Sequence, residues 1–167
     1  MDFETEKRNF ITCYDLYASK IFRHCYFRMY NNKELAADTT QEVFLKAWNY
    51  ISNGNIVKNH KSFLYKIANN LIIDYSRKKK ELSVEKMIEE SGVQFQDSSQ
   101  EQSIELNAEI SEMRDVLDKI PKVYREVLIM RYVDDLRVKD IARILDVNPS
   151  LVSVRIYRGI RKLKRLL

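Results

Sequence analysis

The stretch RVKDIARILDVNPSLVSVRIYRGIRKLKRLL, residues 137–167, decides the fold class. Apolar residues recur every three or four positions across residues 138–145, which predicts a short helix. Residues 146–148 predict a tight turn, and Pro149 is typical of the first turn of a second, longer helix. A short helix, a tight turn and a longer helix together form a helix-turn-helix.

The longer helix of this motif is basic on the faces turned away from its apolar stripe. Arg can form bidentate hydrogen bonds to guanine edges, and Ser can bond bases or phosphates. A helix N-terminus also favours a phosphate group. We therefore favour duplex DNA binding over the alternative, a helical bundle with a solvated basic face. The candidate contacts are Ser150, Ser153, Arg155, Arg158, Arg161 and Lys162.

Helical spacing continues upstream through almost the whole chain. Apolar residues recur at helical intervals in 10–29, 34–51 and 113–120. Ser62 is expected to cap a further helix, and Pro121 is expected to open another. Because only three Gly and two Pro are present, an all-β fold with many tight turns is excluded. The sequence predicts an all-α protein.

Charge divides the chain of 167 residues into three parts. Residues 1–80 carry a net charge of +6, residues 81–112 carry −8 and residues 113–167 carry +7. The acidic part is rich in Ser and Gln and has few large apolar residues, which is typical of a linker. We expect two small helical domains, 1–80 and 113–167, joined by an acidic flexible linker over 81–112.

Composition also limits the chemistry. Two Cys and two His are too few for a four-ligand zinc site of the usual spacing. The sequence contains no Gly-rich phosphate loop and no recognisable nucleophile–base pair, so we expect no enzyme, no cofactor and no metal. No apolar run approaches the roughly 20 residues of a membrane span, and the N-terminus has no apolar signal core. We expect a cytoplasmic protein with reduced thiols and no membrane insertion.

The first basic part places aromatic residues beside amides and cations, around an expected loop at 52–61. Aromatic rings stack on unpaired bases, amides read base edges and cations follow the sugar–phosphate backbone. The residues alone leave open the alternative that the rings form the core and the cations face solvent. The residues concerned are Asn53, Asn55, Lys58, Asn59, His60, Lys61, Phe63, Tyr65, Lys66, Tyr75, Arg77 and Lys78.

Three stretches in order resemble bacterial RNA polymerase sigma factors of the short extracytoplasmic-function group. They are DTTQEVFLKAWNYI at 38–51, SFLYKIANNLIIDYSRKKK at 62–80 and IPKVYREVLIMRYVDDLRVKDIARILDVNPSLVSVRIYRGIRKLKRLL at 120–167. The resemblance implies an alternative sigma factor that binds core polymerase, directs it to promoters and supports DNA opening. The implied partners are the clamp helices and flap of core RNA polymerase, duplex and single-stranded promoter DNA, and the anti-sigma factor that such relatives often have.

The same resemblance implies roles for the matched positions. The polymerase-docking set is Asp38, Gln41, Glu42, Phe44 and Trp48. The −10 set combines a base-capturing loop with a strand-separating helix: Asn53, Asn55, Lys58, Asn59, Lys61, Ser62, Tyr65, Lys66, Asn69, Asn70 and Arg77. The −35 set consists of the six Ser, Arg and Lys residues of the last helix named above. Asn69 departs from the family pattern, since many relatives carry Arg there.

Two other classes of protein fit the same surfaces. One is a repressor or activator that binds duplex DNA without docking on polymerase. The other is an interaction module whose basic faces meet an acidic partner. Binding to core polymerase separates the first interpretation from both alternatives.

Overall fold

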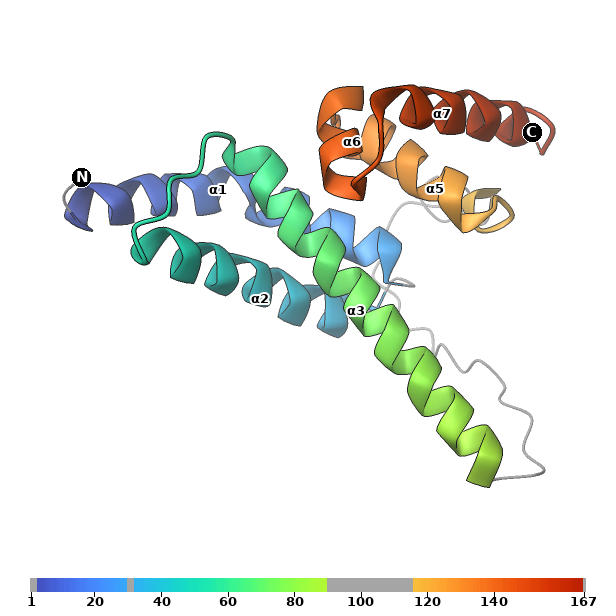
Figure 1. Ribbon diagram of the computed structural model, residues 1–167, viewed down its shortest axis with the longest axis horizontal. Helices are drawn as coiled ribbons and strands as arrows, with labels where there is room; N and C mark the ends of the chain where they lie inside the picture. The colour runs from blue at the N-terminus through green and yellow to red at the C-terminus, as the bar shows by residue number, and fades with distance from the viewer. Residues whose placement is uncertain (1–2, 30–31, 90–115, 167) are drawn as a thin grey trace.

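The computed structural model contains helices and no strand in the residues that it describes, 3–29, 32–89 and 116–166 (Figure 1). The predicted all-α fold class is confirmed. The elements in order are α1 (Phe3–Arg28), α2 (Lys33–Ser52), α3 (His60–Glu89), α5 (Lys122–Leu128), the π-helix η1 (Ile129–Val133), α6 (Val138–Leu145) and α7 (Pro149–Leu163). No helix within these ranges is both long enough and apolar enough to cross a membrane.

Helices α1 and α2 run antiparallel, and α3 crosses them (Figure 1). The Asn32 side chain caps α2 by accepting a hydrogen bond from the Leu35 backbone N–H at 2.9 Å. At the start of α3, the Asn59 side chain accepts from the Ser62 N–H at 2.9 Å. The expectation that Ser62 caps this helix is therefore wrong. The helix begins at His60, two residues before Ser62, so the preceding Asn59 caps it and its side-chain oxygen accepts from the free N–H of Ser62.

Helix α3 continues past residue 80 as far as Glu89. The first part of the expected linker is thus helical. Residues 90–112, the remainder of that linker, lie outside the described residues, so the expected flexibility there stays a prediction.

The predicted helix-turn-helix is confirmed in α6 and α7. Between them Asp146 adopts a left-handed conformation with φ of 55°, and the Val147 N–H donates to the Ala142 carbonyl at 3.0 Å. The Asn148 side chain accepts from the Leu151 N–H at 2.7 Å, and Pro149 follows at the first helical position. The three residues 146–148 therefore both end α6 and cap the start of α7.

The helix after Pro121 changes character halfway along. It is an α-helix to Leu128 and a π-helix from Ile129 to Val133, where the Asp134 N–H bonds the carbonyl of Ile129, five residues back, at 3.0 Å. A π-turn accommodates one extra residue in the helix and occurs frequently at functional sites. Asp135 follows with a positive φ of 50°, so the chain turns sharply there.

One buried apolar cluster runs through both halves of the molecule, residues 3–89 and 116–166. Leu64 and Ile72 belong to it from α3, while Leu136, Ile141 and Ile144 belong to it from the second half. Helix α6 packs against α3, and η1 packs against α1. The sequence pattern did not predict this packing, which we call the closed contact.

Candidate polymerase and nucleic-acid interface

Helix α2 presents one exposed polar strip on the outside of the first half. Asp38, Gln41 and Glu42 are exposed, and the last two follow Asp38 by three and four residues, so they lie on the same side of the helix as Asp38. Leu45 continues this strip and is 59% exposed. The sequence contained a signal for Leu45, since it falls outside the apolar stripe of α2. A partly apolar, acidic strip suits a partner that carries Arg among apolar residues.

The two aromatic members of the polymerase-docking set lie differently. Phe44 is buried, and its ring packs edge-on against Tyr14 with centroids 4.7 Å apart. Direct contact between Phe44 and a partner is therefore excluded in this structure, and its role is to hold α1 against α2. Trp48 is half-buried beside Phe10, with ring centroids 5.1 Å apart.

The loop between α2 and α3 is shaped by its own side chains. Gly54 takes φ of 84°, a conformation that other residues resist. Asn55 donates to the Tyr50 carbonyl at 2.9 Å, and Asn59 caps α3. These two amides are thus partly used inside the loop, while Asn53 and Lys58 are exposed. Ile56 stands out at 83% exposed, an apolar loop residue that was not predicted as a contact.

The first turns of α3 face the second half of the chain. Lys61 donates to the Asp135 carbonyl at 2.8 Å, and the Ser62 hydroxyl donates to Asp140 at 3.0 Å. Lys66 donates to the carbonyls of Ile144 at 2.9 Å and Arg143 at 3.2 Å. Three residues of the expected −10 set are therefore occupied by contacts within the chain.

Two further residues of that set are buried. Tyr65 has no exposed surface, and Asn69 is 2% exposed. Their expected contact with DNA is not available in this arrangement, because the closed contact and the helical core enclose them. Asn70 and Arg77 are exposed on α3.

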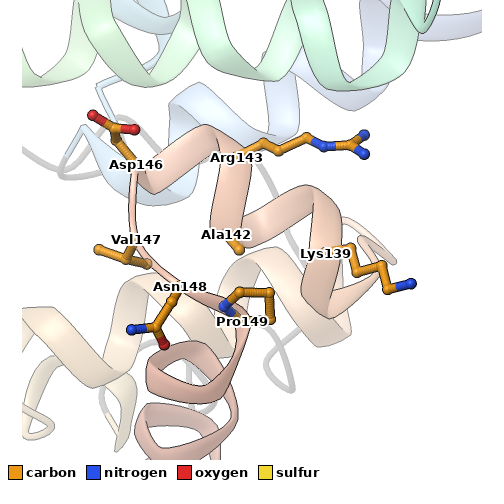
Figure 2. Close-up of a pocket in the computed structure, with 7 residues that line it drawn as sticks. All are labelled: Lys139, Ala142, Arg143, Asp146, Val147, Asn148 and Pro149. Atoms are coloured by element: carbon orange, nitrogen blue, oxygen red, sulfur yellow. The ribbon is translucent and has the colours of Figure 1, made fainter.

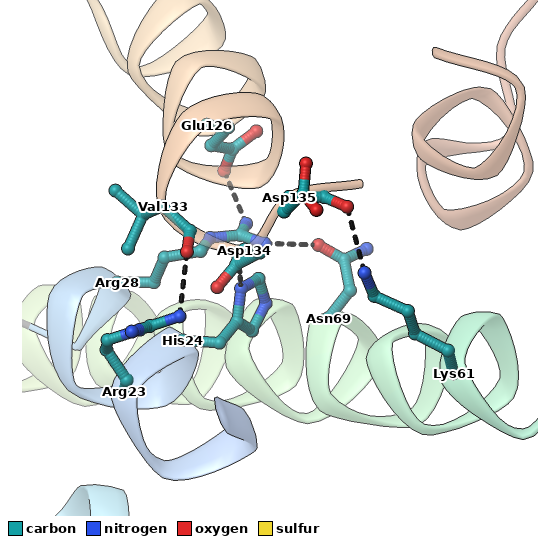
Figure 3. A network of polar contacts seen from close by, with 9 residues as sticks. All are labelled: Arg23, His24, Arg28, Lys61, Asn69, Glu126, Val133, Asp134 and Asp135. Atoms are coloured by element: carbon teal, nitrogen blue, oxygen red, sulfur yellow. Dashed lines mark hydrogen bonds and ion pairs between the residues drawn. The ribbon is translucent and has the colours of Figure 1, made fainter. Parts of the chain in front are cut away.

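A buried polar network crosses between the halves (Figure 3). His24 Nδ1 donates to Asp134 Oδ2 at 2.7 Å, and both side chains are fully buried. Arg28 donates to Asn69 Oδ1 and to Glu126 Oε1, each at 2.7 Å. We call these five residues the polar latch. Nothing in the sequence around His24 indicates a partner 110 residues away along the chain.

Burial governs the protonation of His24 in the latch. It lowers the pKa of His24 against the opposing effect of Asp134, and His24 Nε2 has no hydrogen-bond partner to accept an added proton. Burial raises the pKa of the Tyr65 hydroxyl, and the nearby Asp134 adds to this effect. Burial alone would raise the pKa of Asp140, but hydrogen bonds from Arg137 and Ser62 outweigh it and lower that pKa.

The predicted −35 residues lie together on α7. Ser150, Ser153, Arg158, Arg161 and Lys162 are exposed, and Arg155 is half-buried. A hollow of about 480 Å³ opens beside the start of this helix (Figure 2). Lys139 and Arg143 of α6 line it together with Asp146 and Asn148 of the turn, and Arg143 also pairs with Asp140 at 3.7 Å. Two cations next to a helix N-terminus can hold a phosphate, and their spacing of four residues on α6 was the overlooked signal.

The two cysteines and the possible metal ligands are further reactive groups of the chain. Cys13 and Cys25 are free and buried, and burial raises the pKa of Cys25 to about 12. Within the described ranges, no group of three or more His, Cys, Asp or Glu side chains is placed to hold a metal ion.

Comparison with known families matches both halves separately. The Sigma-70 region 2 family matches residues 13–81, and the Sigma-70, region 4 family matches residues 110–163. The ECF RNA polymerase sigma factor SigW of Bacillus subtilis is 34% identical over 166 residues, covering 92% of this chain and 86% of the relative. SigM of the same organism, also an ECF RNA polymerase sigma factor, is 30% identical over 155 residues, covering 92% of this chain and 91% of the relative.

Solved structures show the same fold. The sigma factor RpoE of Bartonella quintana, solved with the anti-sigma factor NepR, superposes with a TM-score of 0.76 at 18% identity, covering 95% of this chain and 96% of that one. CnrH, solved with the cytosolic domain of CnrY, superposes with a TM-score of 0.70 at 18% identity, covering 96% and 88%.

Proposed function

Because the chain belongs to the extracytoplasmic-function group of RNA polymerase sigma factors, we propose a division of labour among its surfaces. As an alternative sigma factor it binds core RNA polymerase, directs it to promoters and supports DNA opening. The proposal is that residues 1–80 dock on polymerase and handle the −10 element, and that residues 113–167 read the −35 element. The observation that carries it is the exposed Ser and Arg face of α7 on a complete helix-turn-helix.

The −10 element is assigned to the loop before α3 and to the first turns of that helix. Unstacking DNA costs a few kcal/mol per step. Capture of unpaired bases recovers about 1–3 kcal/mol per base where aromatic groups stack on them. We assign the contacts with a flipped base and its backbone to Asn53 and Lys58, which are exposed, together with the exposed apolar side chain of Ile56 in the same loop.

The −35 element is assigned to α7 lying in the major groove. Arg158 reads base edges from the exposed face, while Lys139 and Arg143 hold the backbone beside the helix N-terminus. Polymerase docking is assigned to Asp38, Gln41 and Glu42 of α2, with Leu45 as an apolar contact.

Two further features complete the proposal. The chain supplies no catalytic group of its own and leaves nucleotide chemistry to the polymerase, beside which it works in the cytoplasm. It also takes an anti-sigma factor as a partner. Support comes from RpoE and CnrH, which share this fold and were solved with NepR and with the cytosolic domain of CnrY.

The test is run-off transcription with core polymerase and this chain as the sole added specificity factor, on a promoter library randomised in both elements. We expect transcripts enriched for one −10 and one −35 sequence. A chain that binds duplex DNA but yields no transcript above core polymerase alone would contradict the proposal and favour a repressor or activator.

A further inference from the structure

We infer that the free chain occludes its own −10 surface: α6 covers the start of α3 and presents oxygen atoms where DNA phosphates would bind. The inference rests on the −10 assignment proposed above. It adds a competitor to that site, built into the same chain.

The first step is coverage. Lys61, Ser62 and Lys66 each donate a hydrogen bond to the second half of the chain, and Tyr65 and Asn69 are buried. A DNA strand and the second half cannot both occupy this part of α3, since two groups cannot fill one volume. The closed contact and −10 binding by these residues therefore exclude each other.

The second step is the chemistry of the cover. Lys66 donates to the carbonyls of Arg143 and Ile144, which lie in the last turn of α6, where the helix dipole is negative. Ser62 donates to the Asp140 carboxylate. Partial and full negative charges on oxygen thus satisfy the donors that a phosphate backbone would satisfy in the open protein. Helix α6 imitates the charge of the ligand that it displaces.

The third step is that the cover can be released. His24 and Asp134 meet across the boundary, which favours closure. Closure also leaves His24 Nε2 buried without a hydrogen-bond partner, and opening would return it to water. A contact that makes hydrogen bonds but leaves a buried nitrogen unsatisfied is less stable than a fully satisfied one, so it can open more readily.

The −35 reader remains free in the closed form. Ser150, Ser153 and Arg158 of α7 are exposed while α6 lies on α3. Self-occlusion therefore blocks one DNA surface and spares the other. Duplex binding through α7 and single-strand binding through α3 should respond differently to closure.

The experiment fixes the closed contact covalently in the full-length chain. Ser62 and Asp140 face each other across the boundary with their side-chain oxygens 3.0 Å apart, so Ser62→Cys with Asp140→Cys brings two thiols near each other for oxidation to a disulfide. Burial raises the pKa of the native Cys13 and Cys25 thiols, which slows their oxidation. Each single Cys variant is a control, and the reduced double variant is the reference for the oxidised one.

The experiment has two readouts. The first is binding to a labelled single-stranded oligonucleotide pool, randomised at its centre, in the presence of core polymerase. The second is run-off transcription. We expect oxidation to lower both at least tenfold and reductant to restore both, with α7-dependent duplex binding unchanged. Equal single-strand binding in the two redox states would overturn self-occlusion and leave the −10 assignment intact. Binding in neither state would overturn the −10 assignment and the inference with it. If the double variant does not oxidise, a short reducible bifunctional thiol cross-linker replaces the disulfide, and a double variant that neither treatment joins would contradict the closed contact.

A second pair of variants opens the contact instead. Asp134→Asn removes the carboxylate charge that His24 Nδ1 contacts. Asp135→Asn, the matched control, removes an equal charge from the neighbouring residue. Asp135 contacts Lys61 through its backbone carbonyl, and Asn tolerates its positive φ, so its variant keeps the closed contact. We expect Asp134→Asn alone to raise single-strand binding by the free chain severalfold. Identical behaviour of the two variants would contradict the role of the latch.

Discussion

At the scale of single residues, the least expected feature is His24, a buried imidazole that pairs with an aspartate from the other half of the chain. It faces Asp134 from the loop after η1, Arg28 from its own helix, Glu126 from α5 and Tyr65 from α3. Its pKa is lowered, chiefly because burial disfavours the charged ring. The closed contact therefore contains a group that resists protonation.

The pH dependence follows from that direction. His24 in the closed form binds a proton less readily than an imidazole in water, whose pKa is near 6.5. Closure is therefore fully favoured above about pH 6.5 and weakens as the pH falls below it. We expect energy transfer between dyes on the two halves to decrease from pH 7.5 to about pH 5.5.

His24→Asn is the control for this titration. Asn keeps a donor near the position of Nδ1 but has no proton to gain, so the change in energy transfer over that range should disappear. A variant that opens with the same pH profile as the natural sequence would assign the titration to another group.

Gly159 shows how one missing side chain sets the distance between two helices. A Cβ at this position would lie 3.1 Å from Leu128 Cδ1 and 3.3 Å from Tyr124 Cβ, so α7 and α5 approach closely only because it is absent. Gly159→Ala should gain up to about 1 kcal/mol of helix propensity. Overpacking against the buried Leu128 should cost about 1–3 kcal/mol, so we expect a net loss of stability in urea unfolding.

A second substitution makes this result specific. In a Leu128→Ala background the added methyl group has room, so Gly159→Ala should then be neutral or stabilising. The same loss in both backgrounds would show that the packing distance is not the cause.

At the scale of helices, α7 carries the assignment of the −35 reader. Arg158 is exposed on α7, and a bidentate contact with guanine is worth about 1–3 kcal/mol of discrimination. Arg158→Ala should relax the preference at one or two base positions in a library selection. Lys162→Ala should weaken binding to all sequences alike. A uniform loss for Arg158→Ala as well would reassign that side chain to phosphate.

Helix α2 offers a separate test of polymerase docking. Asp38→Ala removes an exposed carboxylate from the proposed strip, and Asp15→Ala removes one from an exposed position on α1. We expect only the first to weaken binding to core polymerase, by up to about tenfold, equivalent to about 1.4 kcal/mol. Binding is measured by fluorescence anisotropy of the labelled chain, with helicity checked by circular dichroism. Unchanged affinity would reject this face as the docking surface.

The sequence predicted α6, the turn and α7 well, because local rules decide them: apolar period, an Asn cap and Pro at the first position. It failed where a contact depends on distant residues. The π-helix has the apolar composition of an ordinary α-helix, so its sequence does not distinguish the two. Lys66 bonds to Arg143 and Ile144 at the end of α6, which lie 77 and 78 positions further along the chain. Tyr65 was predicted to stack on bases, and its burial depends on elements that its local sequence does not specify.

At the scale of the whole molecule, the shared apolar cluster should make the two halves unfold together. Trp48 is the only tryptophan and lies in the first half, so its fluorescence reports that half, whereas circular dichroism reports all helices. We expect the two signals to change at one urea concentration in the natural chain. Asp134→Asn should separate them, and Asp135→Asn should not.

Separate transitions in the natural chain would contradict a shared core. Coincident transitions in Asp134→Asn would show that apolar packing alone couples the halves. Either result is independent of DNA binding, so it tests the architecture apart from the function.

The π-turn at Ile129–Val133 bears on how such a chain can change over evolutionary time. Each residue added to or removed from a helix rotates everything beyond it by about 100°. The π-turn absorbs its extra residue locally, so deleting one residue there would restore an ordinary α-helix and leave the orientation of Asp134 in place. An insertion or deletion at this turn is therefore a genetic event that the closed contact tolerates, whereas one in α5 that no such turn absorbs would rotate Asp134 away from His24.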